Sequence, residues 1–456
     1  MDNVYLIGIG GIGMSALARY YKHNNLFVAG YDRTPSNLTS HLQAEGIDIN
    51  FQDSVDIIPK RIKDNPDSLI IFTPAIPKDS AQLQWFKDND YKILKRSQAL
   101  GYLAASKKCL AVAGTHGKTT TSTLLAHLLH DSGEGCTAFL GGISSNYNTN
   151  LILSKNNVLV AEADEFDRSF LQLWPEIAVV TSADADHLDI YNNHETILGA
   201  FADFAGQVKK SGTLIVKKGL ESKITGKTLS KVLIYSYDQP CDFFASEIVP
   251  MDGGFFSFTF NYPGGKIEGC RVGIPGWINV ENAIAASAIA VTHGLSPESI
   301  KKSLATFKGV RRRFDIRINT PECSYIDDYA HHPGELEAAI SSMCNIFRNR
   351  KLTVVFQPHL YTRTRDFADG FAQSLGMADE LILMDIYPAR ELPIDGVSSK
   401  MILDKVKLQE KTLANKDNLM EIIANKKIDV LVTFGAGDID RFTDMIEKQL
   451  KEQYNV

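Results

Sequence analysis

Residues 114–120 have the composition and order of a loop that binds nucleotide phosphates. They read Gly-Thr-His-Gly-Lys-Thr-Thr and follow the apolar run 109–113, which predicts a short buried strand. In such a loop the backbone N–H groups face the anion, the lysine reaches the β- and γ-phosphates, and the adjacent hydroxyl binds Mg²⁺. We therefore expect Lys118 on the phosphates and Thr119 on the metal. The remaining loop residues would surround the phosphates: Gly114, Thr115, His116, Gly117 and Thr120.

This loop is shorter than the common P-loop. Val112 stands where the first glycine of that motif would be, and only Thr115 and His116 separate Gly114 from Gly117. The alternative is a helix-capping turn that carries a lysine by chance. The order of strand, loop and predicted helix at 119–130 favours the phosphate loop.

Acidic and imidazole groups follow two further apolar runs. Residues 158–161 lead into Glu162 and two more acids, and residues 177–181 lead to a segment that contains His187. Because the carboxyl ends of parallel strands meet at one edge of a sheet, these groups should converge on the phosphate loop. Carboxylate oxygens are ligands that Mg²⁺ prefers, so the pattern indicates a magnesium–phosphate site.

A second glycine-rich turn lies near the start of the chain. A predicted strand at 4–7 runs into Gly8-Ile9-Gly10-Gly11-Ile12-Gly13-Met14-Ser15, and the strand at 26–32 ends in Asp32. Asp32 follows Gly10 by about twenty positions, a spacing typical of a Rossmann-like turn that binds a diphosphate. NAD, FAD and a UDP-sugar would all satisfy this pattern. A later strand at 68–72 runs into a turn that begins with Thr73.

Length and composition limit the class of protein. A chain of 456 residues suggests about three domains. The net charge of −6 argues against a nucleic-acid-binding protein, and no apolar run is long enough for membrane insertion. With no secretory signal, we expect a cytoplasmic monomer or homodimer. The six cysteines lack paired-ligand spacing and should be buried free thiols.

Changes in sequence texture divide the chain at about residues 107 and 308. Strands and helices alternate in 1–107 and in 309–456, which predicts two Rossmann-like, doubly wound parallel sheets. The middle part, 108–308, carries the phosphate loop. Within it, short alternating runs at about 212–275 are broken by glycine pairs and predict an antiparallel β portion without catalytic groups. The fold class is therefore α/β in three domains.

Short motifs along the whole chain resemble the Mur ligases, the ATP-dependent amide-forming enzymes of bacterial peptidoglycan synthesis. They are GIGGIGMS at 8–15, GTHGKTTT at 114–121, EADE at 162–165, DHLD at 186–189, NVEN at 279–282, RRF at 312–314, DDYAHHP at 327–333 and FQPHLYTRT at 356–364. The resemblance implies a UDP-substrate domain, a central ATPase domain and a C-terminal ligase domain. Within the family, the motifs are most similar to those of enzymes that attach L-alanine to the lactyl carboxylate of UDP-N-acetylmuramic acid, with ATP and Mg²⁺, through an acyl phosphate.

The resemblance also implies roles for individual residues. The catalytic set would be Lys118, Glu162, His187, His331 and Arg363, and the metal ligands would be Thr119, Glu162 and His187. ATP would contact Asn282, Arg313 and Asp328, the last through the ribose hydroxyls. The amino-acid side would be formed by Tyr329, His331, His332, His359 and Arg363, with Arg363 on the alanine carboxylate and one histidine as base. The UDP-substrate would contact Gly10, Gly11, Ile12, Gly13, Met14, Ser15, Asp32 and Thr73.

Some positions depart from the family pattern, and some rival functions remain open. Ser182 replaces an asparagine, Ile278 a histidine, Leu360 an arginine and Arg390 a glycine. The nearest rival is the tripeptide-recycling UDP-muramate ligase, which adds a preformed peptide. An NAD-dependent oxidoreductase or a non-catalytic nucleotide-binding regulator would leave the lysine, threonine and acidic groups around the phosphate loop unexplained.

Overall fold

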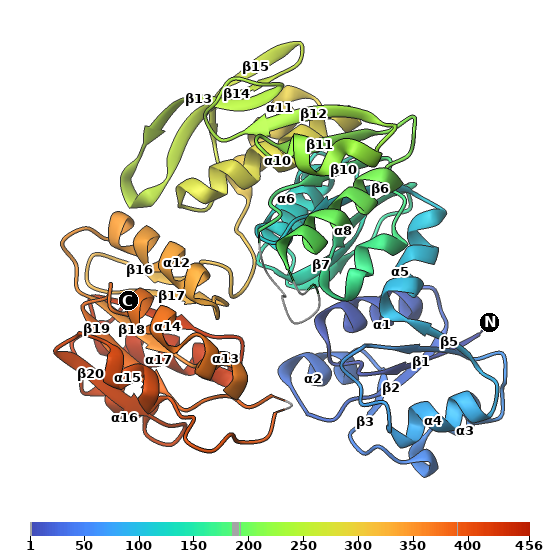
Figure 1. Ribbon diagram of the computed structural model, residues 1–456, viewed down its shortest axis with the longest axis horizontal. Helices are drawn as coiled ribbons and strands as arrows, with labels where there is room; N and C mark the ends of the chain where they lie inside the picture. The colour runs from blue at the N-terminus through green and yellow to red at the C-terminus, as the bar shows by residue number, and fades with distance from the viewer. Residues whose placement is uncertain (1, 185–190, 192, 390) are drawn as a thin grey trace. The chain divides into compact units, whose positions relative to one another are not determined.

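The chain has a three-domain α/β fold, as the alternation of strands and helices predicted. A computed structural model describes residues 2–184, 191, 193–389 and 391–456. The described strands form three sheets, of five, ten and six strands (Figure 1). By its internal contacts the chain separates into two compact units. The first comprises Met1–Val249 and Phe256–Lys308, and the second Pro250–Phe255 and Gly309–Val456.

The first sheet is wholly parallel, with the order β3-β2-β1-β4-β5. The central strand β1 has an apolar run that is fully buried, which explains why it lacks alternation. The strands are β1 (Asn3–Ile7), β2 (Phe27–Tyr31), β3 (Asp48–Asn50), β4 (Leu69–Phe72) and β5 (Lys92–Lys95). The helices are α1 (Ile12–His23), α2 (Asn37–Ala44), η1 (Val55–Ile57), α3 (Lys60–Lys63), α4 (Ala81–Asp88) and α5 (Arg96–Ala105).

The second sheet carries the phosphate loop at its centre, with the order β15-β14-β13-β12-β11-β10-β6-β9-β7-β8. Strand β6 pairs in parallel with both β10 and β9, so its apolar residues are buried. The strands are β6 (Lys108–Ala113), β7 (Thr137–Ser144), β8 (Thr149–Ile152), β9 (Val158–Ala163), β10 (Ile177–Val180), β11 (Thr213–Lys217), β12 (Lys231–Ser236), β13 (Phe243–Pro250), β14 (Phe256–Tyr262) and β15 (Gly265–Arg271). The helices are α6 (Lys118–Asp131), η2 (Phe166–Gln172), α8 (His194–Gln207), α9 (Glu221–Ile224), η3 (Thr225–Lys227), η4 (Asp252–Gly254), α10 (Trp277–His293) and α11 (Pro297–Thr306).

The predicted antiparallel portion is confirmed for β14 and β15, but it begins later than expected. Strands β11, β12 and β13 instead extend the sheet in parallel. The connection from β11 to β12 contains the helical turns α9 and η3, and such a crossover returns the chain in the same direction. Short alternating runs do not distinguish the two directions, which is why the sequence misplaced this boundary.

The third sheet belongs to the second unit and has the order β16-β17-β21-β18-β19-β20. It is parallel except for β16, which forms an antiparallel hairpin with β17. The strands are β16 (Asp315–Asn319), β17 (Ser324–Asp328), β18 (Leu352–Phe356), β19 (Glu380–Met384), β20 (Glu410–Ala414) and β21 (Val430–Phe434). The helices are α12 (Pro333–Ile346), α13 (Tyr361–Asp366), α14 (Ala368–Leu375), α15 (Lys400–Lys405), α16 (Leu419–Ala424), η5 (Asp438–Phe442) and α17 (Thr443–Tyr454).

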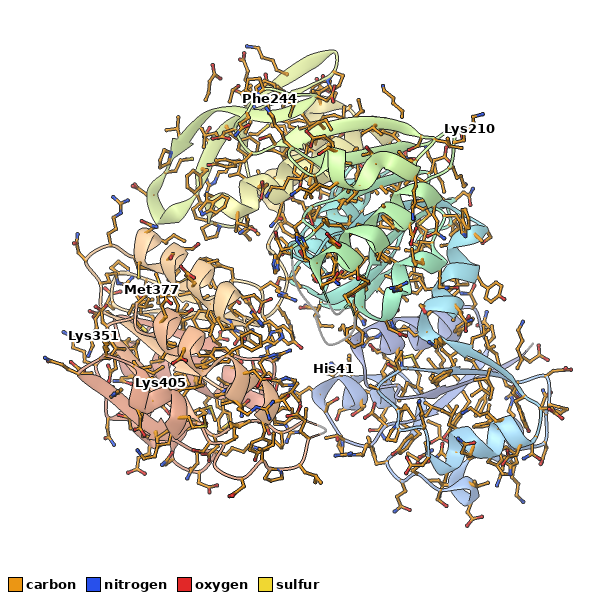
Figure 2. The ribbon with its side chains drawn as sticks, viewed as in Figure 1. His41, Lys210, Phe244, Lys351, Met377 and Lys405 are labelled. Carbon is orange, nitrogen blue, oxygen red and sulfur yellow. The ribbon has the colours of Figure 1, made fainter. Side chains whose placement is uncertain are left out.

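The surface is charged, and the cysteines are unpaired. Lys210 and Lys405 are among the exposed charged side chains (Figure 2). All six cysteines are free thiols, and most are buried, although Cys344 is exposed. Within the described part of the chain, no helix combines the length and the apolar character needed to cross a membrane.

Candidate active site

The phosphate loop leaves β6 through a turn that only glycine fits. Gly114 and Gly117 have φ angles of 139° and 79°, in the left-handed region that favours glycine. A Cβ atom on Gly114 would lie 2.1 Å from Thr181 Oγ1, and one on Gly117 would lie 2.7 Å from Asn282 Oδ1. The loop is therefore held tightly, and helix α6 begins directly at Lys118.

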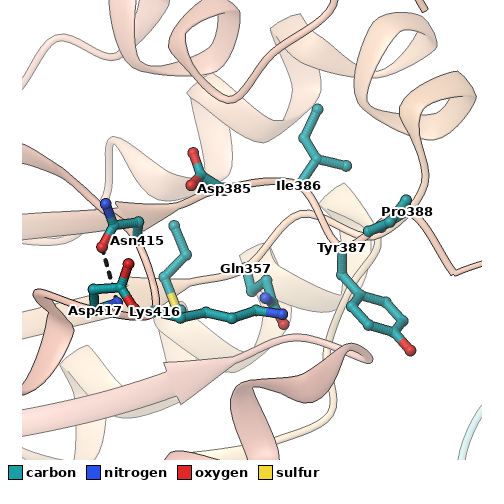
Figure 3. A pocket seen from close by; sticks show the side chains of 9 residues that line it. Gln357, Asp385, Ile386, Tyr387, Pro388, Asn415, Lys416 and Asp417 are labelled. Atoms are coloured by element: carbon teal, nitrogen blue, oxygen red, sulfur yellow. Dashed lines mark hydrogen bonds between the residues drawn. The ribbon is translucent and has the colours of Figure 1, made fainter. Parts of the chain in front are cut away.

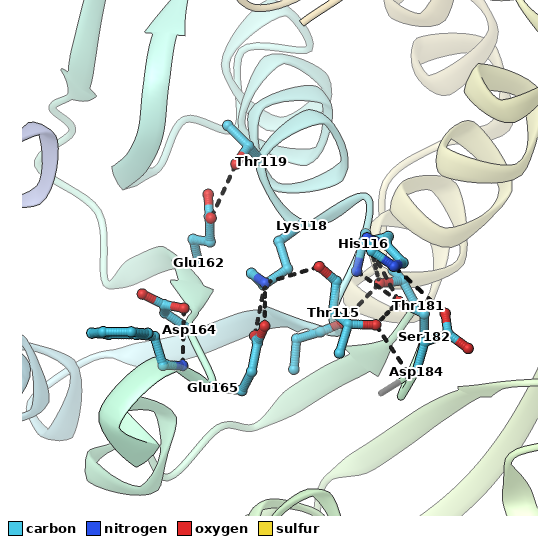
Figure 4. Close-up of polar contacts among 12 residues, drawn as sticks. Thr115, His116, Lys118, Thr119, Glu162, Asp164, Glu165, Thr181, Ser182 and Asp184 are labelled. Atoms are coloured by element: carbon cyan, nitrogen blue, oxygen red, sulfur yellow. Dashed lines mark hydrogen bonds and ion pairs between the residues drawn. The ribbon is translucent and has the colours of Figure 1, made fainter. Parts of the chain in front are cut away.

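Lys118 forms an ion pair with Glu165 inside the first unit (Figure 4). Its ammonium group donates to both carboxylate oxygens, at 2.9 and 2.7 Å, and the two side chains are 12% and 1% exposed. Burial acts to lower the pKa of Lys118, but the nearby carboxylates, led by Glu165, outweigh it and raise that pKa. The lysine therefore remains charged. The sequence located Glu165 only as a strand-end acid and gave it no role.

Thr119 and Glu162 form a pair of oxygen groups beside the loop. The Thr119 hydroxyl donates to Glu162 Oε1 at 3.0 Å (Figure 4). The Gly141 N–H donates to the other carboxylate oxygen, Oε2, at 3.1 Å. Neighbouring hydroxyl and carboxylate oxygens suit the ligand preference of Mg²⁺. The third expected ligand, His187, lies outside the described residues. Among the described residues, no group of three or more histidine, cysteine, aspartate or glutamate side chains is arranged to hold a metal ion.

Ser182 supports the phosphate loop from the end of β10. Its hydroxyl accepts the His116 N–H at 2.7 Å and lies 2.9 Å from Thr115 Oγ1. Thr181 adds a hydrogen bond from its hydroxyl to the His116 carbonyl, at 2.6 Å. Ser182, which stands where the family pattern has an asparagine, therefore has defined hydrogen bonds to the phosphate loop. At another departure, Ile278 is 40% exposed at the start of α10.

The first glycine turn lies at the carboxyl ends of β1, β2 and β4. Asp32 accepts the Gly10 N–H at 2.8 Å, so its carboxylate fixes the turn. A Cβ atom on Gly8 would lie 2.4 Å from the Thr73 methyl group, which places Thr73 at the same edge. Ser15 lies one helical turn further on, and its hydroxyl donates to the Ile12 carbonyl at 2.8 Å. The structure therefore brings the predicted UDP-substrate residues together.

The second unit gathers its predicted residues around the turn that precedes β16. Asp328 accepts the N–H groups of Phe314 and Ala330, at 2.6 and 2.8 Å. Burial raises the pKa of Asp328 to about 6, although Arg313 opposes it. The Arg313 guanidinium lies 5.0 Å from the centre of the Tyr329 ring, a cation–π distance.

His331, His359 and Arg363 form a connected group in the same unit. His331 Nδ1 lies 3.0 Å from the Tyr329 carbonyl and 3.3 Å from Glu335, while the ring centres of His331 and His359 are 6.1 Å apart. Burial lowers the pKa of His331; Glu335 opposes this effect and Arg363 adds to it. A guanidinium nitrogen of Arg363 lies 3.4 Å from His359 Nδ1.

His332 has a different environment from its neighbour His331. It is the N-cap residue of α12, in a capping box with Glu335. Its ring packs against Phe367, with ring centres 4.6 Å apart. These contacts are those of a residue that begins a helix, so a role toward the amino acid stays a prediction.

A cavity of about 320 Å³ lies beyond the carboxyl ends of β18, β19 and β20 (Figure 3). Gln357 lines it and is fixed from both ends of its amide, which donates to Asp438 and accepts the Ile439 N–H, each at 2.9 Å. Tyr387 also lines the cavity, and its ring stacks against that of His359, with ring centres 5.7 Å apart. The sequence marked strand tips in this region but did not predict the cavity.

Comparison with known proteins identifies the family. Three family models match the chain: "Mur ligase family, catalytic domain" at residues 3–108, "Mur ligase middle domain" at 112–290, and "Mur ligase, glutamate ligase domain" at 312–437. The UDP-N-acetylmuramate–L-alanine ligases of Porphyromonas gingivalis and Flavobacterium psychrophilum are 49% and 48% identical to it, over 99% of each chain. The crystal structure of the UDP-N-acetylmuramate-alanine ligase MurC of Thermotoga maritima superimposes with a TM-score of 0.83, at 28% identity over 99% of each chain. Since these matches extend over nearly its whole length, the chain belongs to the Mur ligase family.

Proposed function

We propose that the protein joins L-alanine to the lactyl carboxylate of UDP-N-acetylmuramic acid at the expense of ATP. The products would be UDP-N-acetylmuramoyl-L-alanine, ADP and phosphate, in peptidoglycan biosynthesis. The observation that carries the proposal is the end-to-end similarity, at 48–49% identity, to relatives that bear this activity in their names. The buried lysine of the phosphate loop supports the same chemistry.

The reaction requires activation of an unreactive carboxylate. Transfer of the γ-phosphoryl group would give an acyl phosphate, which the amine of alanine then attacks with release of phosphate. Since two anions must meet, catalysis depends mainly on positioning and charge stabilisation. Lys118 would place its positive charge on the β- and γ-phosphates. To reach them, it would break its ion pair with Glu165. Asn282, Arg313 and Asp328 would hold the rest of the nucleotide.

Mg²⁺ fits the oxygen pair described above. Thr119 and Glu162 would hold it, because their oxygens lie 3.0 Å apart beside the phosphate loop, and His187 is the third proposed ligand. The bound ion would neutralise negative charge on the phosphates. Gly141 supports the carboxylate by donating its N–H to Glu162.

The amino-acid side of the reaction falls to the second unit. Arg363 is suited to bind the alanine carboxylate through its planar fork, and its contact with His359 would orient it. His331 would accept the ammonium proton. If its Nδ1–H donates to the Tyr329 carbonyl, Nε2 keeps the lone pair that a base needs, and the lowered pKa keeps the ring neutral near pH 7.

The remaining assignments follow the same proposal. The turn Gly10–Ser15, with Asp32 and Thr73, would hold the UDP diphosphate at the N-terminus of α1, where free N–H groups favour an anion. We divide the chain into a UDP-substrate domain at 1–107, an ATP-binding domain at 108–308 and a ligase domain at 309–456. Because its substrates are cytoplasmic nucleotides and an amino acid, we place the enzyme in the cytoplasm, as a monomer or homodimer.

Phosphate release tests the proposal directly. The full chain would be assayed with ATP, Mg²⁺ and UDP-N-acetylmuramic acid, together with L-alanine, glycine, L-serine or the L-Ala–D-Glu–diamino acid tripeptide. We expect release that depends on L-alanine and a product heavier by one alanyl residue. Dependence on the tripeptide would instead assign the recycling reaction. No release with any acceptor would refute a ligase acting on this substrate.

A further inference from the structure

The hairpin β7–β8 contacts both the expected metal site and the expected UDP-substrate turn. The two strands pair in antiparallel fashion, with Phe139 opposite Leu151. On β7, the Gly141 N–H holds the carboxylate of Glu162. On β8, the neighbouring residue Asn150 reaches helix α1, which follows the glycine turn. The hairpin therefore contacts two parts of the first unit that are expected to bind different substrates. One is the glycine turn expected to bind the UDP-substrate, and the other is the metal–phosphate site at Glu162.

Asn150 is the polar centre of this contact. Its side-chain amide is fully buried, and its Nδ2 donates to the Ile12 carbonyl at 2.6 Å and to Ser15 Oγ at 2.9 Å. Its Oδ1 accepts from Arg19 at 2.5 Å, and Arg19 is itself held by Glu45. Both amide hydrogens and the carbonyl are therefore used. Because no water competes for a fully buried group, these bonds fix the orientation of the amide.

The two acceptors of this amide lie in the first turn of α1. That turn presents the N–H groups that face outward from a helix N-terminus, and its geometry sets where a bound anion sits. Apolar packing supports the same alignment, because Tyr20 of α1 lies against Phe139 of β7, with ring centres 5.5 Å apart. Apolar packing of this kind does not depend on a particular orientation. The hydrogen bonds of the Asn150 amide do, so they fix the rotation of α1 about its axis and its position along that axis.

We propose that Asn150 is a positioning residue for the UDP-muramoyl substrate. It holds the diphosphate turn in register with the hairpin that also supports Glu162, so the lactyl carboxylate reaches the phosphate loop at the required place. This inference rests on the proposed function, since that function assigns the turn to the UDP diphosphate. It concerns neither ATP nor alanine, so its effects should be confined to one substrate.

The test measures two affinities of the full chain by calorimetry, for UDP-N-acetylmuramic acid and for Mg-ADP. Asn150→Asp keeps the acceptor for Arg19 and the side-chain volume but loses both donors, and Asn150→Ala loses all three bonds. We expect both variants to raise the Kd for UDP-N-acetylmuramic acid about tenfold, as for the loss of one or two buried hydrogen bonds. The Kd for Mg-ADP should stay within about twofold, a difference too small to reflect a lost hydrogen bond.

Asn146→Ala is the matched control. Asn146 belongs to the same hairpin connection, but its amide contacts the Thr306 carbonyl and the Lys308 N–H, away from α1. This variant should leave both affinities unchanged. An equal loss of both affinities in the Asn150 variants, or an unchanged Kd for UDP-N-acetylmuramic acid, would overturn the proposal.

Arg19→Gln covers the case in which the Asn150 variants do not fold. This variant weakens the hydrogen bond that Arg19 donates to Asn150 Oδ1, while the Asn150 side chain itself is kept. The Kd for UDP-N-acetylmuramic acid should rise about threefold, for loss of part of one hydrogen bond. An unchanged Kd in this variant would also refute the positioning role. If the unaltered chain fails to bind UDP-N-acetylmuramic acid, the proposed function itself is refuted, and this inference with it.

Discussion

The ammonium group of Lys118 lies between the two carboxylate oxygens of Glu165, at 2.9 and 2.7 Å, with both side chains nearly closed to solvent. The charge that we expect to meet ATP therefore already has a partner. An incoming phosphate must displace the Glu165 carboxylate from Lys118. The free energy needed for that exchange lowers the affinity for nucleotide. The two anions compete for one buried cation.

Replacing Glu165 with glutamine should separate these two effects. Removal of one partner from a buried ion pair leaves an uncompensated charge and typically costs about 3–5 kcal/mol. Glu165→Gln should therefore lower the melting temperature by several degrees. Mg-ATP should bind more tightly, because the Glu165 carboxylate no longer competes for Lys118, and should raise the melting temperature of the variant more than that of the unaltered chain.

Thermal unfolding with and without nucleotide measures both effects. Glu176→Gln is a suitable control, since Glu176 pairs with Lys209 at a solvent-accessible site, 3.3 Å apart. Such pairs contribute about 0–1 kcal/mol. If Glu165→Gln were as stable as this control, the buried pair would not matter to the nucleotide-free protein.

Lys118→Ala should remove catalysis while sparing the other substrate site. Loss of a charge contact in the transition state typically lowers the rate by about 10²–10³. We expect phosphate release to fall by at least this factor, with the Kd for UDP-N-acetylmuramic acid nearly unchanged. Lys227→Ala, which breaks a surface pair with Asp203, should have no effect. Near-normal turnover of Lys118→Ala would exclude the phosphate-loop assignment.

Arg363→Ala tests the amino-acid site. If the guanidinium binds the alanine carboxylate, its removal breaks charge-assisted hydrogen bonds and should raise the KM for alanine about tenfold or more. The KM for ATP should change much less. Arg365→Ala supplies the control from the same helix, because Arg365 is exposed and pairs with Asp366. Equal increases in both KM values for Arg363→Ala would place this arginine elsewhere.

The raised pKa of Asp328 predicts a specific dependence of stability on pH. Burial raises the pKa of its carboxyl to about 6 in the folded protein, against a pKa of about 3.9 in an unfolded chain. Between these values the folded state holds a proton that the unfolded state has lost, so stability falls as pH rises. The unaltered chain should therefore lose stability relative to Asp328→Asn between pH 4 and pH 7.

Urea unfolding of both proteins at several pH values measures this difference. The change should be centred between the two titrations and should be complete above pH 7, where the carboxyl is charged in both states. A difference in unfolding free energy that stays constant over this range would contradict the shifted titration of Asp328.

The sequence predicted the local elements of the candidate site and missed the contacts that depend on side-chain direction. Strand β6, the glycine turn and helix α6 follow one another directly, so their order could be predicted from spacing, while phosphate binding by the turn stays a prediction. The motif EADE, by contrast, contains three acids that face three partners. Glu162 meets Thr119, Asp164 lies 3.7 Å from Arg96, and Glu165 meets Lys118.

Contacts between distant segments had no signal in the sequence. Asn150 lies in a stretch of polar residues that resembles an ordinary loop, and its burial against helix α1 appears only when the sheet is assembled. Ser182 showed itself only as a departure from the family pattern, and its hydrogen bond to the phosphate loop follows from the pairing of β10 with β6.

Gly141 has a consequence for how this chain tolerates genetic change. Its backbone needs no glycine, yet a Cβ atom there would lie 2.2 Å from the carboxylate of Glu162. Gly199 of helix α8 is the opposite case, because a Cβ atom there would meet nothing within 4 Å. In a saturation library selected for activity, every replacement at position 141 should disappear, whereas alanine at position 199 should persist. The absence of any replacement at position 141 among the surviving clones would then show that the Glu162 carboxylate lies against this glycine.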